Sequence, residues 1–482
     1  MPLRALRFPR ATPLSIGIAA LLAFSPPTLV AAGTVWAVSA CGDTDPGTLR
    51  AYVGVPTTQP GDILELGGLP CSTITLAAGG TSITVTQSNL TIRNTGPHAI
   101  TIDGSALQDG ITTGSGSRIF THTGAGTLSI QHVNLTGGHV NHDAEIAIGG
   151  CVDSAGNIDL LDSTVSGCSA YSKTLGAKGG AIAAAGTITL SSSGISSNTA
   201  NAPAGGAYGG GLYGINLILD YSTLSGNSAL GGFGVGGAAY SHGNVTLRHS
   251  TISANTSSAA IGGIAAVAAG ANANTFYMAQ STVSGNSADG IGGGIAVNSA
   301  NVHIYNSTIA FNSSVGVSAN SELYAPGIAL KANASAMNVV LSSNVLSNNT
   351  YGAEIEFDLS TANTASHAIT FNAAPANNLI RASFVAPSSP LPADTLTGCP
   401  LLGPLRDNGG PTRTHALFSG SAAIDKGNNT KGFAEDQRGL VSDTPPLPYP
   451  RVSNANADIG AYEVNQSDIV FNSSLEGCPA LN

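Results

Sequence analysis

A short motif returns at a nearly constant interval through the middle of this 482-residue chain. Most copies read Ser-Thr, then an aliphatic residue, then Ser or Ala, and close on Asn two residues later. The intervals between Cys168 and Asn312 average about 29 residues. A repeat of this length predicts a solenoid, because each copy can bury its apolar face only against its neighbours. The copies end at Cys168, Asn198, Asn227, Asn255, Asn286 and Asn312, and a weaker copy ends at Asn349.

Within each copy apolar and polar residues alternate, which is the period of a strand. In one copy, for example, Leu217 and Leu219 precede the Ser-Thr pair and Leu224 follows it. Stacking such strands about 4.8 Å apart builds a continuous core. A leucine-rich repeat has a similar period, but its leucine and helix spacing is missing. With right-handed crossovers between parallel strands, the pattern predicts an all-β, right-handed parallel β-helix.

The recurring asparagines fit this architecture as a structural ladder. Asn tolerates the left-handed turn conformation, and its amide can bond the turn backbone of the coils above and below. Cys168 takes the Asn position in its own copy, so we predict a structural role for it. The predicted ladder consists of Asn198, Asn227, Asn255, Asn286 and Asn312.

Composition excludes several other classes of protein. Charged residues are only 9% of the chain, and 17 Lys and Arg against 27 Asp and Glu give a formal net charge of −10. These few cations cannot supply the basic surface of a nucleic-acid binder. Disorder needs more charge and less apolar content than the 42% found here, and a helical bundle would be richer in Glu, Lys and Leu.

The first 32 residues have the pattern of a signal peptide. Arg4, Arg7 and Arg10 precede an apolar run at residues 14–24, and small residues predict cleavage after Ala32. No apolar run reaches the roughly 18 residues of a membrane-spanning helix. We therefore expect a secreted protein, extracellular or at the cell surface, with outer-membrane association as a variant. A lipobox-like sequence ends at Cys41, but it lies too far from the apolar run to favour lipidation.

Six cysteines in an exported chain predict three disulfides. Other pairings remain open, but proximity in sequence favours Cys41–Cys71, Cys151–Cys168 and Cys399–Cys478. No Cys-x-x-Cys spacing occurs, which argues against a thiolate metal site or a redox motif.

Shifts in composition divide the mature chain into four parts. We place an N-terminal cap at residues 33–60, the parallel β-helix at 61–397, a non-repeating C-terminal module at 398–463 and a tail at 464–482. A cap is expected because the open end of a strand stack would otherwise polymerise.

The C-terminal module carries the most specific motifs. In their order, the segments 407–417, 420–425, 436–439 and 457–463 resemble the choice-of-anchor Q domain of bacterial right-handed β-helix proteins, and segments 43–50, 73–76 and 101–104 are similar to the start of that family. The resemblance implies an exported, often surface-displayed, pectin-lyase-like β-helix whose activity is generally unassigned. Ala422 stands where the family usually has Pro, and the missing anchor motif favours release or non-covalent surface association.

The module also concentrates charge in a chain that is otherwise short of it. Carboxylate oxygens would suit calcium, whereas buried Arg–carboxylate pairs and Asx turns would hold together a loop-rich cap. We favour the structural interpretation and predict no metal or other cofactor, with calcium as the alternative. The residues concerned are Asp407, Arg413, Asp425, Asp436, Arg438, Asp458 and Glu463.

Catalysis on the coils would need clustered carboxylates beside Arg, Lys or His. The strongest candidates are Asp220 and Arg248, which share an outward position on adjacent coils, together with His249. In a polysaccharide lyase, Arg248 or His249 would take the proton beside a uronate carboxylate. We favour the alternative, an exposed ion pair between Asp220 and Arg248 worth roughly 0.2–1 kcal/mol.

A ligand-binding interpretation uses the same face. Tyr277 and His303 share one outward position, and Tyr305 follows two residues after His303. Aromatic faces at strand spacing can stack on sugar rings, although β-favouring residues also pack against one another without a ligand.

We therefore predict an exported, monomeric, non-catalytic β-helix protein that contacts polysaccharide or a host or matrix surface. The first alternative is a polysaccharide lyase or glycoside hydrolase of the pectin-lyase-like fold. The second is a passenger secreted through a separate outer-membrane partner. The shortage of charge on the coils favours binding, because binding tolerates it and acid–base chemistry does not.

Overall fold

The computed structural model describes residues 33–54, 58–107, 117–268, 274–316, 325–352, 355–440, 448–453, 455–465 and 478. The predicted signal peptide at residues 1–32 and most of the predicted tail lie outside the described residues.

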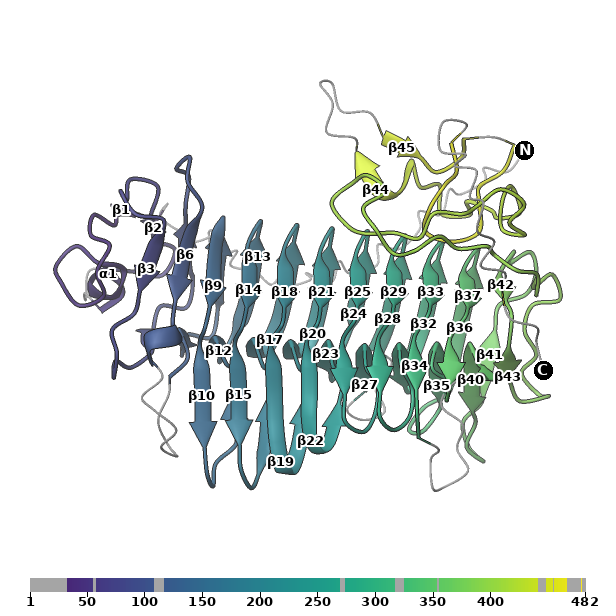
Figure 1. Ribbon diagram of the computed structural model, residues 1–482, viewed down its shortest axis with the longest axis horizontal. Helices are drawn as coiled ribbons and strands as arrows, with labels where there is room; N and C mark the ends of the chain where they lie inside the picture. The colour runs from purple at the N-terminus through teal and green to yellow at the C-terminus, as the bar shows by residue number, and fades with distance from the viewer. Residues whose placement is uncertain are drawn as a thin grey trace, which may run out of the picture. The chain divides into compact units, whose positions relative to one another are not determined.

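Three long sheets of mainly parallel strands enclose a common interior, which confirms the predicted parallel β-helix (Figure 1). In the described chain, sheet A has 21 strands and sheets B and C have 11 each. Strands in the same sheet pair with their counterparts one repeat away, so that Leu224 aligns with Ile195 on one side and with Ile252 on the other. The repeat found in the sequence is therefore one full turn of the solenoid, which we call a rung.

The strand bounds follow the rungs. Sheet B contains β3 (Thr73–Thr75), β6 (Ile100–Asp103), β9 (Val133–Thr136), β14 (Thr164–Ser166), β18 (Gly194–Ser196), β21 (Thr223–Ser225), β25 (Thr251–Ser253), β29 (Thr282–Ser284), β33 (Thr308–Ala310), β37 (Val345–Ser347) and β42 (Leu379–Ile380). Sheet C contains β10 (His139–His142), β11 (Ala147–Ile148), β15 (Ser169–Ser172), β16 (Gly176–Lys178), β19 (Thr199–Tyr208), β22 (Ser228–Val235), β26 (Thr256–Ser257), β30 (Ser287–Ala288), β34 (Ser313–Ser314), β38 (Thr350–Tyr351) and β39 (Ile355–Glu356).

Sheet A is the longest sheet, and most rungs contribute two strand segments to it. It contains β1 (Val35–Ala37), β2 (Ile63–Glu65), β4 (Ile83–Val85), β5 (Leu90–Arg93), β7 (Phe120–His122), β8 (Thr127–Gln131), β12 (Val152–Ser154), β13 (Asn157–Leu161), β17 (Ile182–Ser191), β20 (Leu212–Asp220), β23 (Ala239–Ser241), β24 (Val245–Arg248), β27 (Ile264–Val267), β28 (Asn274–Ala279), β31 (Ile295–Asn298), β32 (Ala300–Tyr305), β35 (Ile328–Lys331), β36 (Met337–Ser342), β40 (Leu359–Ala362), β41 (Ile369–Phe371) and β43 (Ser383–Phe384).

The alternation in the sequence sets which side chains point inward. In β20, Leu217 and Leu219 are buried and Ile218 between them is exposed. Inward residues of successive rungs join one apolar cluster that begins near Val38 and ends near Ile380. Because every rung adds side chains to the same interior, the outer faces of the sheets are left for other roles.

The turn between sheets B and C carries the predicted asparagine ladder. Asn198 donates from Nδ2 to Oδ1 of Asn227 at 2.9 Å, and the same bond recurs at 2.8–2.9 Å up to Asn312. The ladder continues through Asn349 to the carboxylate of Asp358. At its other end the backbone N–H of Cys168 donates to Asn198.

From His132 onward, the turn between sheets A and B, here the A–B turn, holds one residue per rung with a positive φ between 43° and 57°. In six of these turns the next residue is a serine, and these serines form a second ladder that the sequence analysis did not single out; Ser222 N–H, for example, donates to Ser250 Oγ at 3.1 Å. The left-handed residues are His132, Asp162, Ser192, Tyr221, His249, Gln280, Asn306, Ser343 and Asn377.

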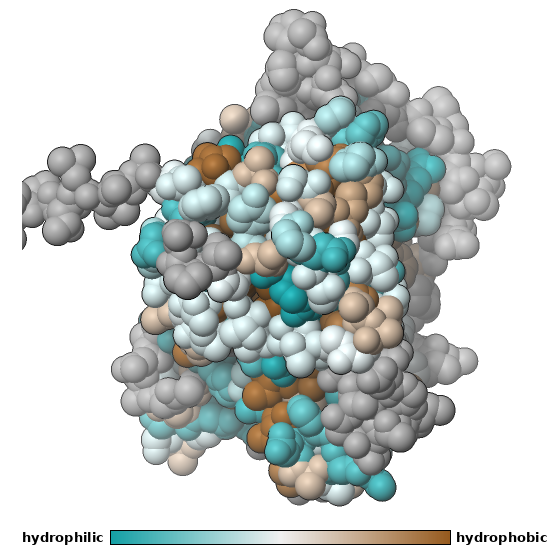
Figure 2. Space-filling model, turned by 90° about the vertical axis from the view of Figure 1, so that its left-hand side faces the viewer, coloured by the Kyte–Doolittle hydropathy of each residue, from teal (hydrophilic) through white to brown (hydrophobic). Residues whose placement is uncertain are grey.

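Three disulfides join the cysteines as predicted: Cys41–Cys71, Cys151–Cys168 and Cys399–Cys478. The first joins Cys41, in the predicted cap, to Cys71, and helix α1 (Leu49–Gly54) between them packs Leu49 and Val53 onto the first rungs. Figure 2 views the end that carries β1 and α1, where hydrophilic and near-neutral colours dominate the described surface. The short 3₁₀ helix η1 (Ser105–Leu107) follows β6.

The C-terminal module is built mainly of loops and contains one antiparallel pair, β44 (Glu435–Leu440) and β45 (Pro448–Pro450). It lies along the A–B turns and the adjacent outer face of sheet B (Figure 1). Its contacts reach rungs far apart in sequence: Tyr221 bonds Glu435, Asn306 bonds Asn428, and Thr308 bonds Ala461.

Candidate functional site

The outer face of sheet A brings the predicted ligand-binding residues together. Tyr277 in β28 and His303 in β32 are register partners on neighbouring rungs, and both side chains are half-buried. The ring centroids of Tyr277 and Tyr305 lie 5.9 Å apart, and those of His303 and Tyr305 lie 6.5 Å apart. Tyr305 is only 5% exposed, so Tyr277 and His303 supply the accessible ring surface of this group.

Two cations border these rings. The guanidinium carbon of Arg248 lies 5.5 Å from the ring centroid of Tyr277, and Lys431 of the C-terminal module places Nζ 4.7 Å from the ring centroid of Tyr305. Burial lowers the pKa of His303, and the charge of Lys431 lowers it further. Burial also raises the pKa of Tyr277. At neutral pH both side chains are therefore uncharged hydrogen-bonding groups on aromatic rings.

The three catalytic candidates do not point to one place. Asp220 and Arg248 are register partners as predicted, but the guanidinium of Arg248 extends toward Tyr277. His249 stacks on Tyr221 with ring centroids 4.3 Å apart, and its side chain is 14% exposed. Its Nε2 lies 4.0 Å from Glu435 of the module, and its Nδ1 lies 3.6 Å from Asp220. His249 is thus enclosed between the solenoid and the module.

A second aromatic group on sheet A was missed by sequence reasoning. Tyr213 in β20 and Tyr240 in β23 are register partners, and their rings stack with centroids 5.8 Å apart and an interplanar angle of 11°. The hydroxyl of Tyr213 lies 2.9 Å from Nε2 of His242. Tyr208 meets Tyr240 edge-on at 5.2 Å, and Nζ of Lys178 lies 5.0 Å from the Tyr213 ring centroid.

Burial also shifts the titration of this second group. It raises the pKa of Tyr240 to about 12. Burial and the positive charge of Lys178 both lower the pKa of His242. The sequence signal for the group is weak, because its tyrosines come from different sheets. Tyr208 is the last residue of β19 in sheet C, whereas Tyr213 and Tyr240 lie near the starts of β20 and β23 in sheet A. Only the glycine-rich corner between the two sheets brings them together. That corner is tight: a Cβ on Gly180 would lie 2.1 Å from the carbonyl oxygen of Gly210.

The charged residues of the C-terminal module form buried pairs. Arg438 Nη2 lies 2.8 Å from Asp436, and Arg451 Nη2 lies 3.3 Å from Glu463, with all four side chains at most 1% exposed. Burial raises the pKa of Glu463 to about 7. Asp458 accepts hydrogen bonds from the backbone N–H groups of Asp425 and Val464. In the described chain, no group of three or more His, Cys, Asp or Glu is arranged to hold a metal ion.

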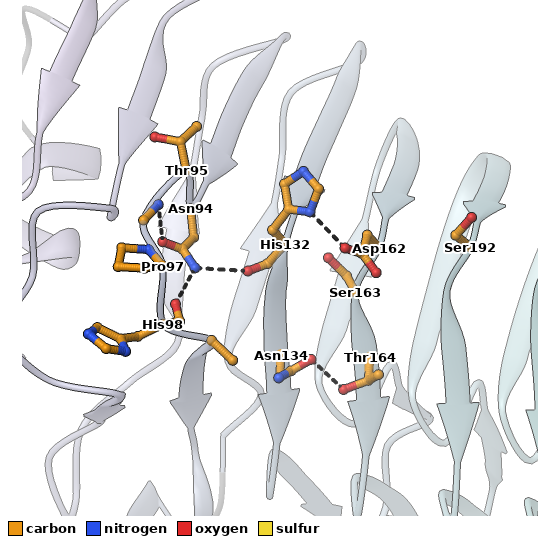
Figure 3. Close-up of a pocket in the computed structure, with 12 residues that line it drawn as sticks. Asn94, Thr95, Pro97, His98, His132, Asn134, Asp162, Ser163, Thr164 and Ser192 are labelled. Atoms are coloured by element: carbon orange, nitrogen blue, oxygen red, sulfur yellow. Dashed lines mark hydrogen bonds and ion pairs between the residues drawn. The ribbon is translucent and has the colours of Figure 1, made fainter. Parts of the chain in front are cut away.

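A polar hollow of about 590 Å³ lies on the early rungs, along A–B turns that the described module does not contact (Figure 3). His132 Nδ1 lies 2.9 Å from Asp162, and the hydroxyl of Thr164 donates to Asn134 at 2.6 Å. The hollow is open and its side chains bond one another, so it offers less to a ligand than the ring surfaces of sheet A. Its other lining residues include Asn94, Thr95, His98 and Ser192.

His415 joins the module to sheet B. Its Nδ1 donates to the carbonyl of Gly403 at 2.6 Å, and its Nε2 accepts from the hydroxyl of Ser284 at 2.8 Å. Burial lowers its pKa from 6.5 to about 4. Neutral His415 therefore fits the interface, because a protonated ring could not accept from Ser284 and would bury a positive charge.

We expect the contribution of His415 to stability to fall as the pH falls from 6.5 to 4. In that window the unfolded chain binds the proton and the folded chain does not, so acidification favours unfolding by up to about 3 kcal/mol. His415→Gln keeps a donor and an acceptor but does not titrate. Thermal unfolding of both proteins should be measured across this pH range. The stability of the wild type relative to the variant should decrease as the pH falls. A constant difference would contradict the assignment.

No family model, curated protein or solved structure matches the chain. The resemblance to the choice-of-anchor Q domain thus stays a prediction from its motifs. In the part of the chain that the structure describes, no helix combines the length and apolar character needed to cross a membrane.

Proposed function

We propose that this is an exported, surface or extracellular β-helix protein of the choice-of-anchor Q type that contacts glycans through the outer face of sheet A without transforming them. The observation that carries the proposal is the pairing of Tyr277 and His303 on adjacent rungs, half-exposed and bordered by Arg248. Export is supported by the leader pattern and by three disulfides, which persist in oxidising compartments.

The chemistry of this surface suits a sugar. A pyranose presents an apolar face that packs on an aromatic ring, and hydroxyls around its edge that need hydrogen-bonding partners. Tyr277 and His303 offer ring faces together with uncharged polar atoms. The sheet beneath them is fixed by the register of the rungs, so the rings are held in place before a ligand arrives.

A polysaccharide lyase or glycoside hydrolase is the less supported alternative. Such an enzyme needs an acid or a base that reaches the scissile bond. His249, the better candidate base, is 14% exposed and lies against Tyr221 and Glu435. The guanidinium of Arg248 lies over the ring of Tyr277 and not beside Asp220 or His249.

A glycan-array screen of the purified chain tests the proposal. We expect binding to a subset of polysaccharides, and roughly tenfold weaker binding by Tyr277→Ala and by His303→Ala, because each loses a stacking face. Tyr171→Ala is the matched control, since Tyr171 is a half-buried outward residue of β15 in sheet C.

The same samples should be followed for the ultraviolet absorbance of unsaturated uronates and for new reducing ends. Binding without either product supports the proposal. Product that accumulates with time, or binding that survives both variants, would contradict it.

A further inference from the structure

We infer that sheet A carries two separate ring clusters and that one extended glycan crosses the sheet to occupy both. The Tyr213 cluster consists of Lys178, Tyr208, Tyr213, Tyr240 and His242. The Tyr277 cluster consists of Arg248, Tyr277, His303, Tyr305 and Lys431. This inference rests on the proposed function, and it adds a second subsite, a ligand orientation and a minimum ligand length.

The Tyr213 cluster has the features of a sugar subsite in its own right. Tyr213 and Tyr240 stack on each other and are half-buried, so the parts of the two rings that remain exposed lie side by side across two rungs. The Tyr213 hydroxyl and His242 Nε2 form a polar pair at 2.9 Å beside those rings. Burial and Lys178 both lower the pKa of His242, which keeps this pair uncharged at neutral pH.

The two clusters lie at opposite margins of the same sheet. Tyr213 stands near the start of β20, whereas Ile218, five residues later, lies in the outward column that continues through Thr246 to Tyr277. At about 3.3 Å per strand residue the two columns are at most roughly 16 Å apart, because β20 pairs with β23 and β24 as two separate segments and the chain bends between those two strands. Tyr240 and Tyr277 belong to adjacent rungs, so the shortest path between the clusters runs mainly along the strands.

Apolar side chains line that path. Ile215 is 46% exposed and Ile218 is 40% exposed, although both lie in β20, whose neighbouring residues Leu217 and Leu219 are buried in the core. Exposed isoleucines between two ring clusters give a ligand continuous apolar contact from one margin to the other. A short fragment reaches one cluster, whereas a chain longer than about 16 Å reaches both.

Charge selects among extended glycans. Each cluster holds a cation against a tyrosine ring: Lys178 lies 5.0 Å from the Tyr213 centroid and Arg248 lies 5.5 Å from the Tyr277 centroid. Lys431 adds a third positive charge at the Tyr277 cluster. Because the chain as a whole has a net charge of −10, these cations mark this face as the one that attracts acidic substituents.

The test is a length series prepared from the glycan that binds best on the array. Affinities of fragments from two to about ten sugar units would be measured by calorimetry with the wild type, Tyr213→Ala/Tyr240→Ala, Tyr277→Ala/His303→Ala and the Tyr171→Ala control. We expect wild-type affinity to rise at least tenfold once the fragment spans both clusters. Each double variant should lose that rise and keep the affinity of a short fragment.

A second series compares the acidic glycan with its carboxyl-reduced or desulfated form. We expect Lys178→Gln to weaken binding of the acidic form more than binding of the neutral form. If an alanine variant unfolds, Tyr213→Leu/Tyr240→Leu retains apolar volume without the rings.

The outcomes separate the two proposals. Wild-type binding that the Tyr277 variant abolishes, with no dependence on length and no effect of the Tyr213 variant, overturns the second cluster and leaves the proposed function intact. Binding to no glycan at all overturns the proposed function. Equal affinity for acidic and neutral chains overturns the selection by charge.

Discussion

Replacement of Arg438 by methionine is expected to destabilise the C-terminal module by about 3–5 kcal/mol. The guanidinium lies between two rings, 4.0 Å from the centroid of Tyr449 and 3.9 Å from that of Tyr462. It also donates to Asp436 at 2.8 Å and to the carbonyl of Glu463 at 2.7 Å. Without it, the carboxylate of Asp436 is left in the interior without its cation. Arg438→Lys should recover only part of the loss, because an ammonium neither stacks nor binds in the bidentate manner.

Hydrogen exchange and thermal unfolding would measure this effect. Exchange should accelerate at residues 435–440, since the same strand contacts Tyr221 and Thr282 on the solenoid. Arg406→Met is the matched control. Arg406 is exposed, and its side chain donates to the neighbouring Asn408. Equal stability of the Arg438 and Arg406 variants would show that the buried pair contributes little.

Replacement of Asn286 by alanine is expected to cost about 3–5 kcal/mol in the stability of the solenoid. Asn286 Nδ2 donates to Asn312 Oδ1 and to the carbonyl of Ile252, and its Oδ1 accepts from the side chain and the backbone of Asn255. Alanine leaves these partners buried without hydrogen bonds, in rungs above and below the substitution.

Asn338→Ala provides the comparison for Asn286→Ala. Asn338 also bonds an asparagine of the neighbouring rung, Asn301, but both partners lie on the surface and the bond is 3.4 Å long. Its removal should change the unfolding midpoint in denaturant by a small fraction of the change at Asn286. Similar midpoints for the two variants would mean that burial of the ladder adds nothing to its strength.

The sequence contained most of the solenoid because its rungs repeat the same local pattern. The alternation around Leu217 and Leu224 determines which residues face inward, and the register follows from aligning one copy on the next. The same alignment correctly pairs Asp220 with Arg248 and Tyr277 with His303. The cysteine pairs were predictable because they are local: in two of the three disulfides the paired cysteines are 30 residues or fewer apart in sequence.

The proposed binding surface and the location of the module were harder to predict because they depend on contacts that do not repeat. Tyr208 and Tyr240 approach each other across a corner between two sheets, where rung length varies. The module lies against turn residues of different chemical types, among them Tyr221, His249 and Gln280, so no sequence pattern marks its location. The pairing of Arg451 with Glu463 could not be predicted either, because the two residues are separated by a loop.

The position of the C-terminal module has a consequence for how the solenoid loses its structure. A stack of rungs that touch only their neighbours behaves as a one-dimensional lattice, and it frays from its ends at the cost of one interface at a time. The module bonds Tyr221, Thr282, Thr308 and Ser343, which belong to four different rungs. Fraying of the rungs beneath it must therefore break several of these bonds together, which turns the carboxyl-terminal half into one cooperative block, while the rungs before Tyr221 keep the behaviour of a simple lattice.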